Sequence, residues 1–393
     1  MGPKIYTETD HRIRHEDVDK DALEVIFRLK SAGHTAYLVG GGVRDLLLQK
    51  QPKDFDISTS ARPEQIKELF GRRCLLIGQR FRLAHVRMGN KVLEVSTFRA
   101  GDANSSSLIV RDNRWGTPEE DVLRRDFTIN ALFYDPTTHT VLDYVGGYQD
   151  IHHRLLRTIG DPHARFKQDP VRMIRLIKFR ARFGFEVEQK AMRALHSCQE
   201  EILKSAPARV LEEVFKMLES GYATNFFQLM SDSSFLEILF PCFHHFFLGA
   251  SKEIACTYLS TIDEIHQKED ITLDRAALLA VLVFPILEQE LITLSQDRQM
   301  AMSFGDIVHL SNSLLRGITT SSFAHFPKKI VAITHYIMTT QYRLTPLSGK
   351  PKFASRYSSM HDFRLAIDFL RIRCQVNPDL NDLYHGWKKA HHL

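Results

Sequence analysis

The stretch Leu38–Ser58 reads LVGGGVRDLLLQKQPKDFDIS. It continues an apolar run at Ala36–Val39, which predicts a buried strand, into three consecutive glycines. The apolar residues near Val43–Leu48 predict a short helix that Pro52 ends, and a second strand is expected at Asp54–Thr59. The order of strand, glycine turn, short helix and strand indicates a mixed α/β domain.

Two aspartates, Asp54 and Asp56, stand two residues apart in this second strand. Successive strand residues point to opposite faces, so we expect both carboxylates on one face, with Phe55 and Ile57 on the core side. Adjacent carboxylates repel each other unless a cation neutralises them, and their hard oxygens suit Mg²⁺. The spacing therefore predicts a magnesium site at Asp54 and Asp56.

Glu94 is the candidate third carboxylate. In VLEVS it lies between Leu93 and Val95 and therefore faces away from them, and an acid in the middle of a strand is unusual without a partner. With the two aspartates it would complete a two-metal site that clamps the attacking and leaving oxygens of an in-line phosphoryl transfer. The alternative for Glu94 is an exposed acid or an ion-pair partner.

The glycines form a candidate phosphate site. Gly40 and Gly41 precede the expected helix, where small residues allow backbone N–H groups to approach a phosphate chain closely. Arg44 and Lys53 would add positive charge there. A glycine triplet is more often a simple turn and a DxD pair more often surface acid, so the hypothesis depends on their order and spacing together.

The composition is that of a globular protein. The 393 residues are enough for two to three domains, and a hydrophobic content of 44% is enough for a sizeable core. The net charge of +5 and the sequence pI of about 8.8 are compatible with an acidic partner such as nucleic acid but do not require one.

The sequence favours a cytoplasmic location. No run of about eighteen apolar residues appears, so no membrane span is predicted, and the charged N-terminus lacks the apolar region of a secretory signal. The five cysteines are odd in number, scattered and without a CxxC pair. They are expected to be reduced thiols, neither a disulfide framework nor a zinc site.

Strand patterns fill the N-terminal part and helical patterns the rest. Beyond the opening stretch, a helix is expected at 21–32 and another from Pro63, and residues 101–118 are expected to form a mobile loop. Strands are expected at Cys74–Ile77, Phe81–Met88, Val92–Phe98, Phe127–Phe133 and Leu142–Tyr144, with a hairpin at Gly89-Asn90. From Arg165 onward we expect helices and no strand, over 170–184, 189–203, 208–220, 223–231 and 250–393.

Four further motifs follow in order: RRDFTINAL (Arg124–Leu132), DYVGG (Asp143–Gly147), DPVRMIRLIKFRARFGF (Asp169–Phe185) and PARVLEEVFKML (Pro207–Leu218). With GGxVRD and DxD, they resemble the nucleotidyltransferase superfamily, in its branch of bacterial poly(A) polymerases and class II CCA-adding enzymes. The resemblance covers most of the chain. It implies an α+β fold: a polymerase β-like mixed-sheet head (1–158), a helical neck for base recognition (159–222) and a helical, RNA-binding body (223–393).

The resemblance assigns roles to particular residues. Asp54 and Asp56 would hold the metals, and the glycine turn with Arg44 would bind the triphosphate. Arg125 would lie by the phosphates of the nucleotide and Asp126 by its sugar, since a guanidinium suits phosphate and a carboxylate accepts a ribose hydroxyl.

The same resemblance places base recognition at the start of a helix. Asp169 and Arg172 would present acceptors and donors to a base edge without a nucleic-acid template. Asp169 and Pro170 also suit the N-cap and N1 positions, so part of the motif is a helix start. Gln168 stands where the family commonly has Glu, which implies that Arg172 is held less firmly.

Two further sets of charges lie in the expected helices. Arg175, Lys178 and Arg182 share a stripe that is either a solvated face or a contact for RNA or phosphate; the opposite side carries Met173, Ile174, Leu176 and Ile177. Arg209 with Glu212 or Glu213 is expected to be a structural pair within one helix. Cys242–His245 is expected to pack in the core, and His361-Asp362 lacks the other ligands of a phosphohydrolase site.

The resemblance implies transfer of AMP from ATP to RNA 3′ ends, with release of pyrophosphate. LLIGQRFRLAHV (Leu75–Val86) resembles the poly(A) polymerase signature except at Gln79, where a basic residue is usual, and favours poly(A) addition over CCA addition to tRNA. A non-catalytic RNA-binding relative is a further alternative, against which the intact carboxylates argue. The chain ends at Leu393 without a long Arg-rich tail, so we expect the helical body to grip RNA and processivity to be low.

Overall fold

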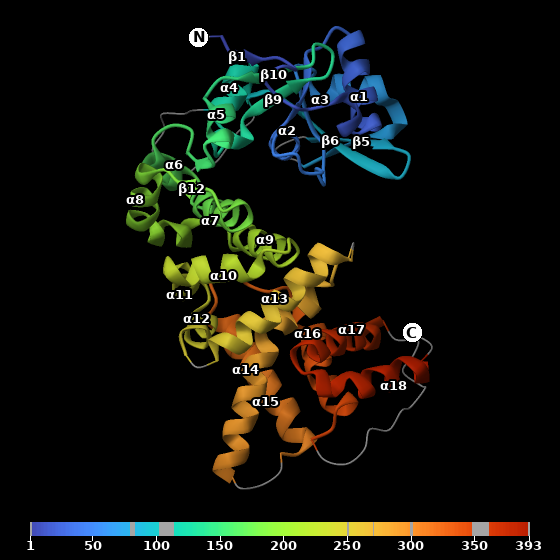
Figure 1. Cartoon of the computed structure of the whole chain (residues 1–393), viewed down its shortest axis with the longest axis vertical. Helices are drawn as coiled ribbons and strands as arrows, with labels where there is room; N and C mark the ends of the chain where they lie inside the picture. Colours follow the sequence, from blue (N-terminus) through green and yellow to red (C-terminus); the bar gives the residue numbers. More distant parts are fainter. Residues whose placement is uncertain are drawn as a thin grey trace. The chain divides into compact units, whose positions relative to one another are not determined.

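The computed structural model describes residues 2–78, 83–101, 114–249, 251–269, 271–298, 302–347 and 361–391. The chain divides into two compact units (Figure 1). The first comprises Met1–Leu176 and Gly184–Glu201, and the second comprises Ile177–Phe183 and Ile202–Leu393. Helix α7 (Val171–Phe183) contributes residues to both units.

An eight-stranded mixed sheet forms the centre of the first unit. Its strand order is β1-β10-β9-β2-β3-β6-β5-β4, and β3 and β6 pair in parallel while the other neighbours are antiparallel. The bounds are β1 (Lys4–Tyr6), β2 (Ala36–Val39), β3 (Asp56–Thr59), β4 (Cys74–Ile77), β5 (Leu83–Met88), β6 (Lys91–Thr97), β9 (Leu132–Asp135) and β10 (Thr140–Asp143). The mixed sheet expected from the sequence is confirmed.

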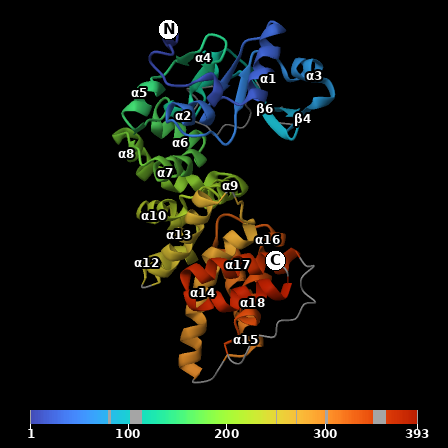
Figure 2. The same ribbon diagram turned by 45° about the vertical axis from the view of Figure 1, so that its right-hand side comes forward.

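Helices α1 (Lys20–Ser31) and α3 (Pro63–Phe70) pack against the strands (Figure 2). Asp19 caps α1, because its carboxylate accepts from the backbone N–H groups of Asp21 and Ala22. The apolar residues at helical spacing, Ala22, Val25, Ile26 and Leu29, are all buried. The face predicted from periodicity is therefore the face that packs.

Shorter elements complete the first unit. Helix α2 (Gly41–Leu47) starts inside the glycine triplet, and the hairpin partners β7 (Arg99–Ala100) and β8 (Arg114–Trp115) are antiparallel. The remaining elements are η1 (His15–Asp17), η2 (Gly71–Arg73), α4 (Pro118–Leu123), η3 (Thr128–Asn130), α5 (Gly147–His152), β11 (Leu155–Leu156), α6 (Pro162–Gln168), β12 (Glu186–Val187) and α8 (Gln189–Ser197).

The second unit is helical in the residues that the structure describes. Its core includes the rings of Tyr258, Phe284, Tyr342 and Phe369, which contact one another at centroid distances of 5.2–6.4 Å. From the unit boundary onward the elements are η4 (Gln199–Lys204), α9 (Pro207–Leu218), α10 (Ala223–Asp232), α11 (Phe235–Leu239), α12 (Pro241–Leu248), α13 (Lys252–Lys268), α14 (Arg275–Arg298), α15 (Phe304–Ser321), α16 (Lys328–Leu344), α17 (His361–Val376), η6 (Pro378–Leu380) and α18 (Asn381–His391).

One helix among the described residues is long and apolar enough to cross a membrane by length and composition. It is the stretch Arg275–Gln296 of α14, and 61% of its most apolar window is buried inside the protein. The buried core helix of a globular protein passes the same test, and Pro285 lies inside this helix. The expectation that the chain has no membrane span stays a prediction.

Several sequence expectations differ from the structure. Arg114–Trp115, expected in a loop, is the strand β8. Thr128–Asn130 is a 3₁₀ turn and not part of a strand, because the backbone N–H groups of Asn130 and Ala131 bond back to Phe127 and Thr128. β12 is a strand in the region expected to be helical, but a two-residue strand leaves no periodicity to detect. Asp54 precedes β3 and is not inside it. Residues 79–82 of the signature and 102–113 of the expected loop lie outside the described residues.

Candidate active site

The glycine turn brings helix α2 close to the aspartate pair. Gly40 has φ +72° and ψ −132°, a conformation that L side chains rarely adopt, and it is the N-cap of α2. A Cβ on Gly42 would lie 3.2 Å from the backbone oxygen of Asp54, which is tighter than nine in ten real Cβ contacts. The absence of side chains here thus allows the start of α2 to lie directly beside the residue that leads into β3.

Gly40→Ala tests the backbone requirement of this turn. This conformation, with positive φ and strongly negative ψ, costs a non-glycine residue about 1–3 kcal/mol, so we expect the free energy of unfolding to fall by that amount. Urea unfolding followed by circular dichroism measures it. Gly317→Ala is the matched control, since Gly317 lies inside α15, where alanine is favoured, and no atom lies within 4 Å of its added Cβ. Equal stability of Gly40→Ala and wild type would contradict the argument.

Asp56 and Glu94 share one exposed face of the sheet. Ser58 pairs with Ser96 in the parallel register of β3 and β6, and their hydroxyl oxygens lie 3.0 Å apart. Two residues earlier on each strand the same register sets Asp56 beside Glu94, and both are exposed, as is Asp54. The prediction that Glu94 faces away from the core is confirmed.

These three carboxylates fit a hard divalent cation by their chemistry. Their oxygens are exposed and of the kind that Mg²⁺ prefers. Across the described ranges, however, no three or more His, Cys, Asp or Glu side chains are gathered so that they could hold one metal ion. Glu94 also has a neighbour of its own, His85, whose Nε2 lies 4.0 Å from Oε2 of Glu94. Metal binding by Asp54, Asp56 and Glu94 therefore stays a prediction.

Arg125 joins the glycine turn to the sheet face of the aspartates. Its Nη2 lies 3.4 Å from Oγ of Ser58, and its Nη1 donates to the backbone oxygen of Asn130 at 3.4 Å. A Cβ on Gly40 would lie 3.5 Å from the same Nη1. A guanidinium in this position is placed to meet an anion at the turn.

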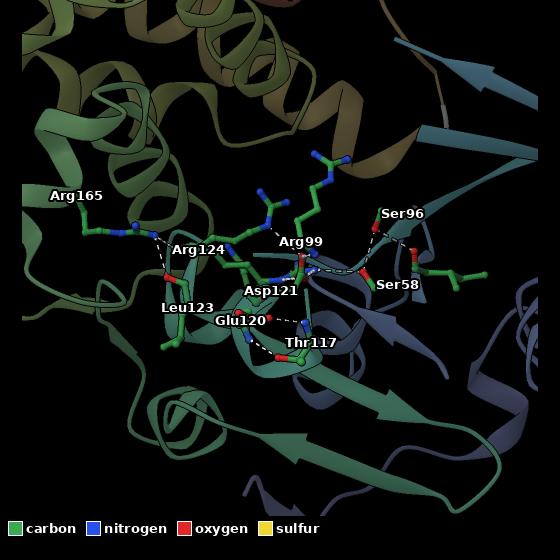
Figure 3. A network of polar contacts seen from close by, with 12 residues as sticks. Ser58, Ser96, Arg99, Thr117, Glu120, Asp121, Leu123, Arg124 and Arg165 are labelled. Atoms are coloured by element: carbon green, nitrogen blue, oxygen red, sulfur yellow. Dashed lines mark hydrogen bonds and ion pairs between the residues drawn. The ribbon is translucent and has the colours of Figure 1, made fainter. Parts of the chain in front are cut away.

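Asp121, a residue that the sequence reasoning missed, holds the arginine pair (Figure 3). It is 2% exposed and accepts from Nε of Arg124 (3.1 Å), Nη2 of Arg125 (2.7 Å) and the backbone N–H of Arg99 (3.2 Å). Burial raises the pKa of this carboxyl, but the charges of Arg125 and Arg124 outweigh burial and lower it. The signal in the sequence is the spacing of Asp121 three and four residues before two arginines.

Asp126 lies at the centre of a second buried network. Its Oδ2 accepts from Nε (2.7 Å) and Nη2 (2.6 Å) of Arg175, and its Oδ1 accepts from the Phe127 backbone (2.8 Å) and from Asn130 (3.2 Å). Burial alone would raise its pKa, but Arg175, the Asn130 hydrogen bond and Arg172 bring it well below the usual range. The hydrogen bond from a ribose hydroxyl to Asp126 stays a prediction.

Arg44 is 3% exposed and belongs to the same network. It donates through Nε (2.9 Å) and Nη2 (2.8 Å) to Asp45 and through Nη1 (2.5 Å) to the side chain of Asn130. Because Asn130 bonds Asp126 in turn, α2 is connected to Asp126 through one amide. A direct contact of Arg44 with triphosphate stays a prediction, as does that of Lys53, which is exposed.

The predicted base-reading residues lie at the start of α7. Asp169 ends α6, and its Oδ2 lies 3.9 Å from Nε of Arg172. Arg172 is buried, and its Nη2 donates to the backbone oxygen of Arg124 at 2.8 Å. Helix α7 begins at Val171, one residue later than expected. The base-reading role stays a prediction for both residues.

Gln168 contacts a cation that the sequence reasoning did not single out. Its Oε1 accepts from Nη1 of Arg165 at 2.9 Å, and Nη2 of Arg165 donates to the backbone oxygens of Leu123 (3.2 Å) and Arg125 (2.9 Å). Burial lowers the pKa of Arg165 to about 10. Gln168 thus orients Arg165, and Arg165 fixes the backbone just before Asp126. The sequence analysis had instead predicted an effect of Gln168 on Arg172.

Two of the three cations in the stripe on α7 pair with acids inside the protein, and Arg182 lies over the ring of Phe183. Arg175 binds Asp126, and Lys178 forms a hydrogen-bonded ion pair with Glu213 of α9. Arg175 and Lys178 therefore do not form the solvated helix face that was one of the two alternatives for this stripe. Glu212, expected to pair within its own helix, accepts from both terminal nitrogens of Arg275 at 2.7 and 2.9 Å. These acids of α9 therefore brace α7 and α14, and the four apolar residues of α7 are buried as predicted.

A glycine turn and an aspartate pair on a mixed sheet, with an Arg-Asp pair beside them, are the features that the sequence analysis expects of a nucleotidyltransferase. Three family descriptions match the chain: Poly A polymerase head domain at residues 36–157, Probable RNA and SrmB-binding site of polymerase A at 184–247, and Polymerase A arginine-rich C-terminus at 318–393. Poly(A) polymerase I of Salmonella typhi is 35% identical over 98% of this chain and 84% of its own length. That of Escherichia coli O157:H7 is 36% identical over 96% and 83%. The chain belongs to the poly(A) polymerase family.

CCA-adding enzymes are relatives as well. That of Lactobacillus helveticus is 35% identical over 56% of this chain and 55% of its own length. Among solved structures, the Bacillus stearothermophilus CCA-adding enzyme in complex with CTP has a TM-score of 0.63 at 24% identity, and covers 95% of this chain and 82% of that one. This likeness shows the fold, which is the α+β fold expected from the sequence.

Proposed function

We propose that this chain transfers AMP from ATP to the 3′ ends of RNA without a template and releases pyrophosphate. The observation that carries the proposal is the convergence of three features on one side of the sheet. Gly42 lies against the backbone of Asp54, Asp56 and Glu94 share the exposed face, and Arg125 reaches from the glycine turn to Ser58. A phosphate chain, a divalent cation and a nucleophile can meet there.

The reaction consists of attack by the RNA 3′-hydroxyl on the α-phosphorus of ATP. Asp54, Asp56 and Glu94 would hold Mg²⁺, which when bound supplies a more acidic hydroxyl and neutralises the leaving group. Arg125 binds phosphate oxygens, and Asp126 keeps Arg175 and Asn130 in place around the nucleotide. No covalent intermediate is needed, so the protein contributes positioning and charge.

The neck and body supply recognition in this proposal. Asp169 and Arg172 read the base edge of ATP, with Arg172 oriented by the backbone oxygen of Arg124. Residues 1–158 act as the catalytic head, 159–222 as the neck and 223–393 as an RNA-binding body. The reaction is placed in the cytoplasm, where the odd number and scattered positions of the cysteines would suit reduced thiols.

Poly(A) addition is favoured over CCA addition because the poly(A) polymerase relatives match 93–98% of the chain, whereas the CCA-adding relatives match 56–65%. The signature Leu75–Val86 supports the same choice. Its described residues form β4 and most of β5, while residues 79–82 lie outside the described part.

A primer-extension assay distinguishes the activities. Oligoadenylate and a tRNA lacking its CCA end are each offered with ATP alone, CTP alone or both. We expect long extension of oligoadenylate with ATP alone. Addition that stops after C, C and A on the tRNA would indicate the CCA-adding activity, and RNA binding without any addition would indicate a non-catalytic relative.

A further inference from the structure

Strands β4, β5 and β6 form an arm of the sheet with one buried and one exposed face. The buried face carries residues such as Ala84, Val86, Leu93 and Val95. The other face is exposed except at Leu83 and His85, which are half-buried, and four of its seven side chains are apolar. Its side chains are Leu75, Ile77, Leu83, His85, Arg87, Val92 and Glu94.

One exposed apolar side chain, Leu75, continues the row of the candidate catalytic carboxylates. Cross-strand register sets Glu94 opposite His85 and His85 opposite Leu75, so that a single row runs from Asp56 across four strands to the edge strand β4. Neighbouring strands lie about 4.8 Å apart, so this row spans roughly 14 Å. A few nucleotides of an extended single strand cover that length.

The side chains of this face suit unpaired bases. Leu75 is 63% exposed and Val92 58% exposed, so they offer aliphatic surface on which a base can pack, and His85 adds a half-buried imidazole ring. Arg87 of β5 is exposed opposite Val92 on the same face and can meet the phosphate backbone. Sheet faces with stacking side chains and nearby cations bind single-stranded RNA with little sequence preference.

We propose that this face, the β4–β6 platform, binds the last unpaired nucleotides of the RNA and leads the 3′-hydroxyl to Asp56. The proposal rests on the proposed function and names how that site takes its second substrate. Single-stranded RNA is the occupant because the platform begins at the carboxylates where a 3′ end must arrive, and because paired bases cannot present their faces to it. A duplex with a blunt 3′ end should therefore bind more weakly than a single strand.

The test compares Leu75→Ser/Val92→Ser with Ile5→Ser. Ile5 is 56% exposed on β1, at the opposite edge of the same sheet, so it controls for loss of an exposed apolar side chain. Binding of a 5′-fluorescein oligoadenylate is followed by anisotropy without ATP. We expect the double variant to raise Kd for the oligoadenylate about tenfold and to leave KM for ATP unchanged, with Ile5→Ser equal to wild type.

A second measurement uses the wild-type chain. An oligoadenylate with 4-thiouridine at its 3′-terminal positions is irradiated in the complex, and crosslinked peptides are expected from residues 74–97. Unchanged primer affinity in the double variant, or crosslinks confined to other segments, would overturn the platform. So would loss of a concentration-dependent dimer in that variant, because the face would then be a contact between copies. Wild-type chain that extends no primer would overturn the proposed function instead.

Discussion

Asp56→Asn is expected to abolish nucleotide addition, with kcat reduced by about 10³-fold, while the protein keeps its fold. The asparagine keeps the shape and one acceptor oxygen but removes the charge that would hold the metal beside the phosphates. Removal of a group that stabilises developing charge typically costs 10²–10³-fold in rate. Because Asp56 is exposed, the substitution leaves no buried group unsatisfied. Primer extension with oligoadenylate and ATP measures the rate, and thermal unfolding measures the fold.

Glu68→Gln on α3 is the matched control, since it removes an exposed carboxylate from the same unit and should leave kcat unchanged. Glu94→Gln separates the two alternatives for that residue. If Glu94 is a metal ligand, Glu94→Gln should reduce kcat about as much as Asp56→Asn does. If Glu94 only pairs with His85, the reduction in kcat should be small. Near-normal activity of Asp56→Asn would sink the catalytic assignment of the aspartate pair.

The fold of the first unit was predictable where side-chain periodicity is strong. The apolar face of α1, the start of α3 at Pro63 and the bounds of β4 all follow from local patterns that tertiary contacts reinforce. The 3₁₀ turn at Thr128–Asn130 was not predictable, because its apolar surroundings read as a strand while a long-range bond from Thr128 to the Arg157 backbone bends the chain.

The site was predictable in its motifs but not in its supports. The aspartate spacing and the placement of Glu94 follow from the two-residue repeat of a strand. Arg165 donates to the backbone of Leu123, 42 residues away, and Lys178 pairs with Glu213, 35 residues away, and only the folded chain brings these segments together. Local spacing cannot distinguish an arginine in solvent from one that pairs with a buried carboxylate. The sequence alone therefore left two interpretations open for the cations on α7.

Asp126→Asn is expected to destabilise the protein by about 2–3 kcal/mol and to impair activity as well. Breaking a fully buried ion pair costs about 3–5 kcal/mol. The loss expected for Asp126→Asn is smaller, because a third of the Arg175 side chain is exposed and solvent screens its charge. The amide leaves Arg175 and Arg172 close together without the carboxylate that neutralises them. Urea unfolding measures the loss. Arg180→Ala, on an exposed position of the same helix, should stay within about 0.5 kcal/mol of wild type.

The dependence of the free energy of unfolding on pH below 4 provides an independent test of the ionised state of Asp126. The pKa of Asp126 in the folded chain lies below its ordinary value of 3.8, so the folded state binds this proton less readily than the unfolded chain does. Its stabilisation is therefore fully present above pH 4 and is lost as the pH falls below 3.8 toward the folded pKa. In Asp126→Asn the free energy of unfolding should fall less steeply with acid, while Asp121 keeps its own contribution in both proteins. An unchanged slope would mean that Arg175 and Asn130 do not hold Asp126 as a carboxylate, and its role beside the nucleotide would lose its physical basis.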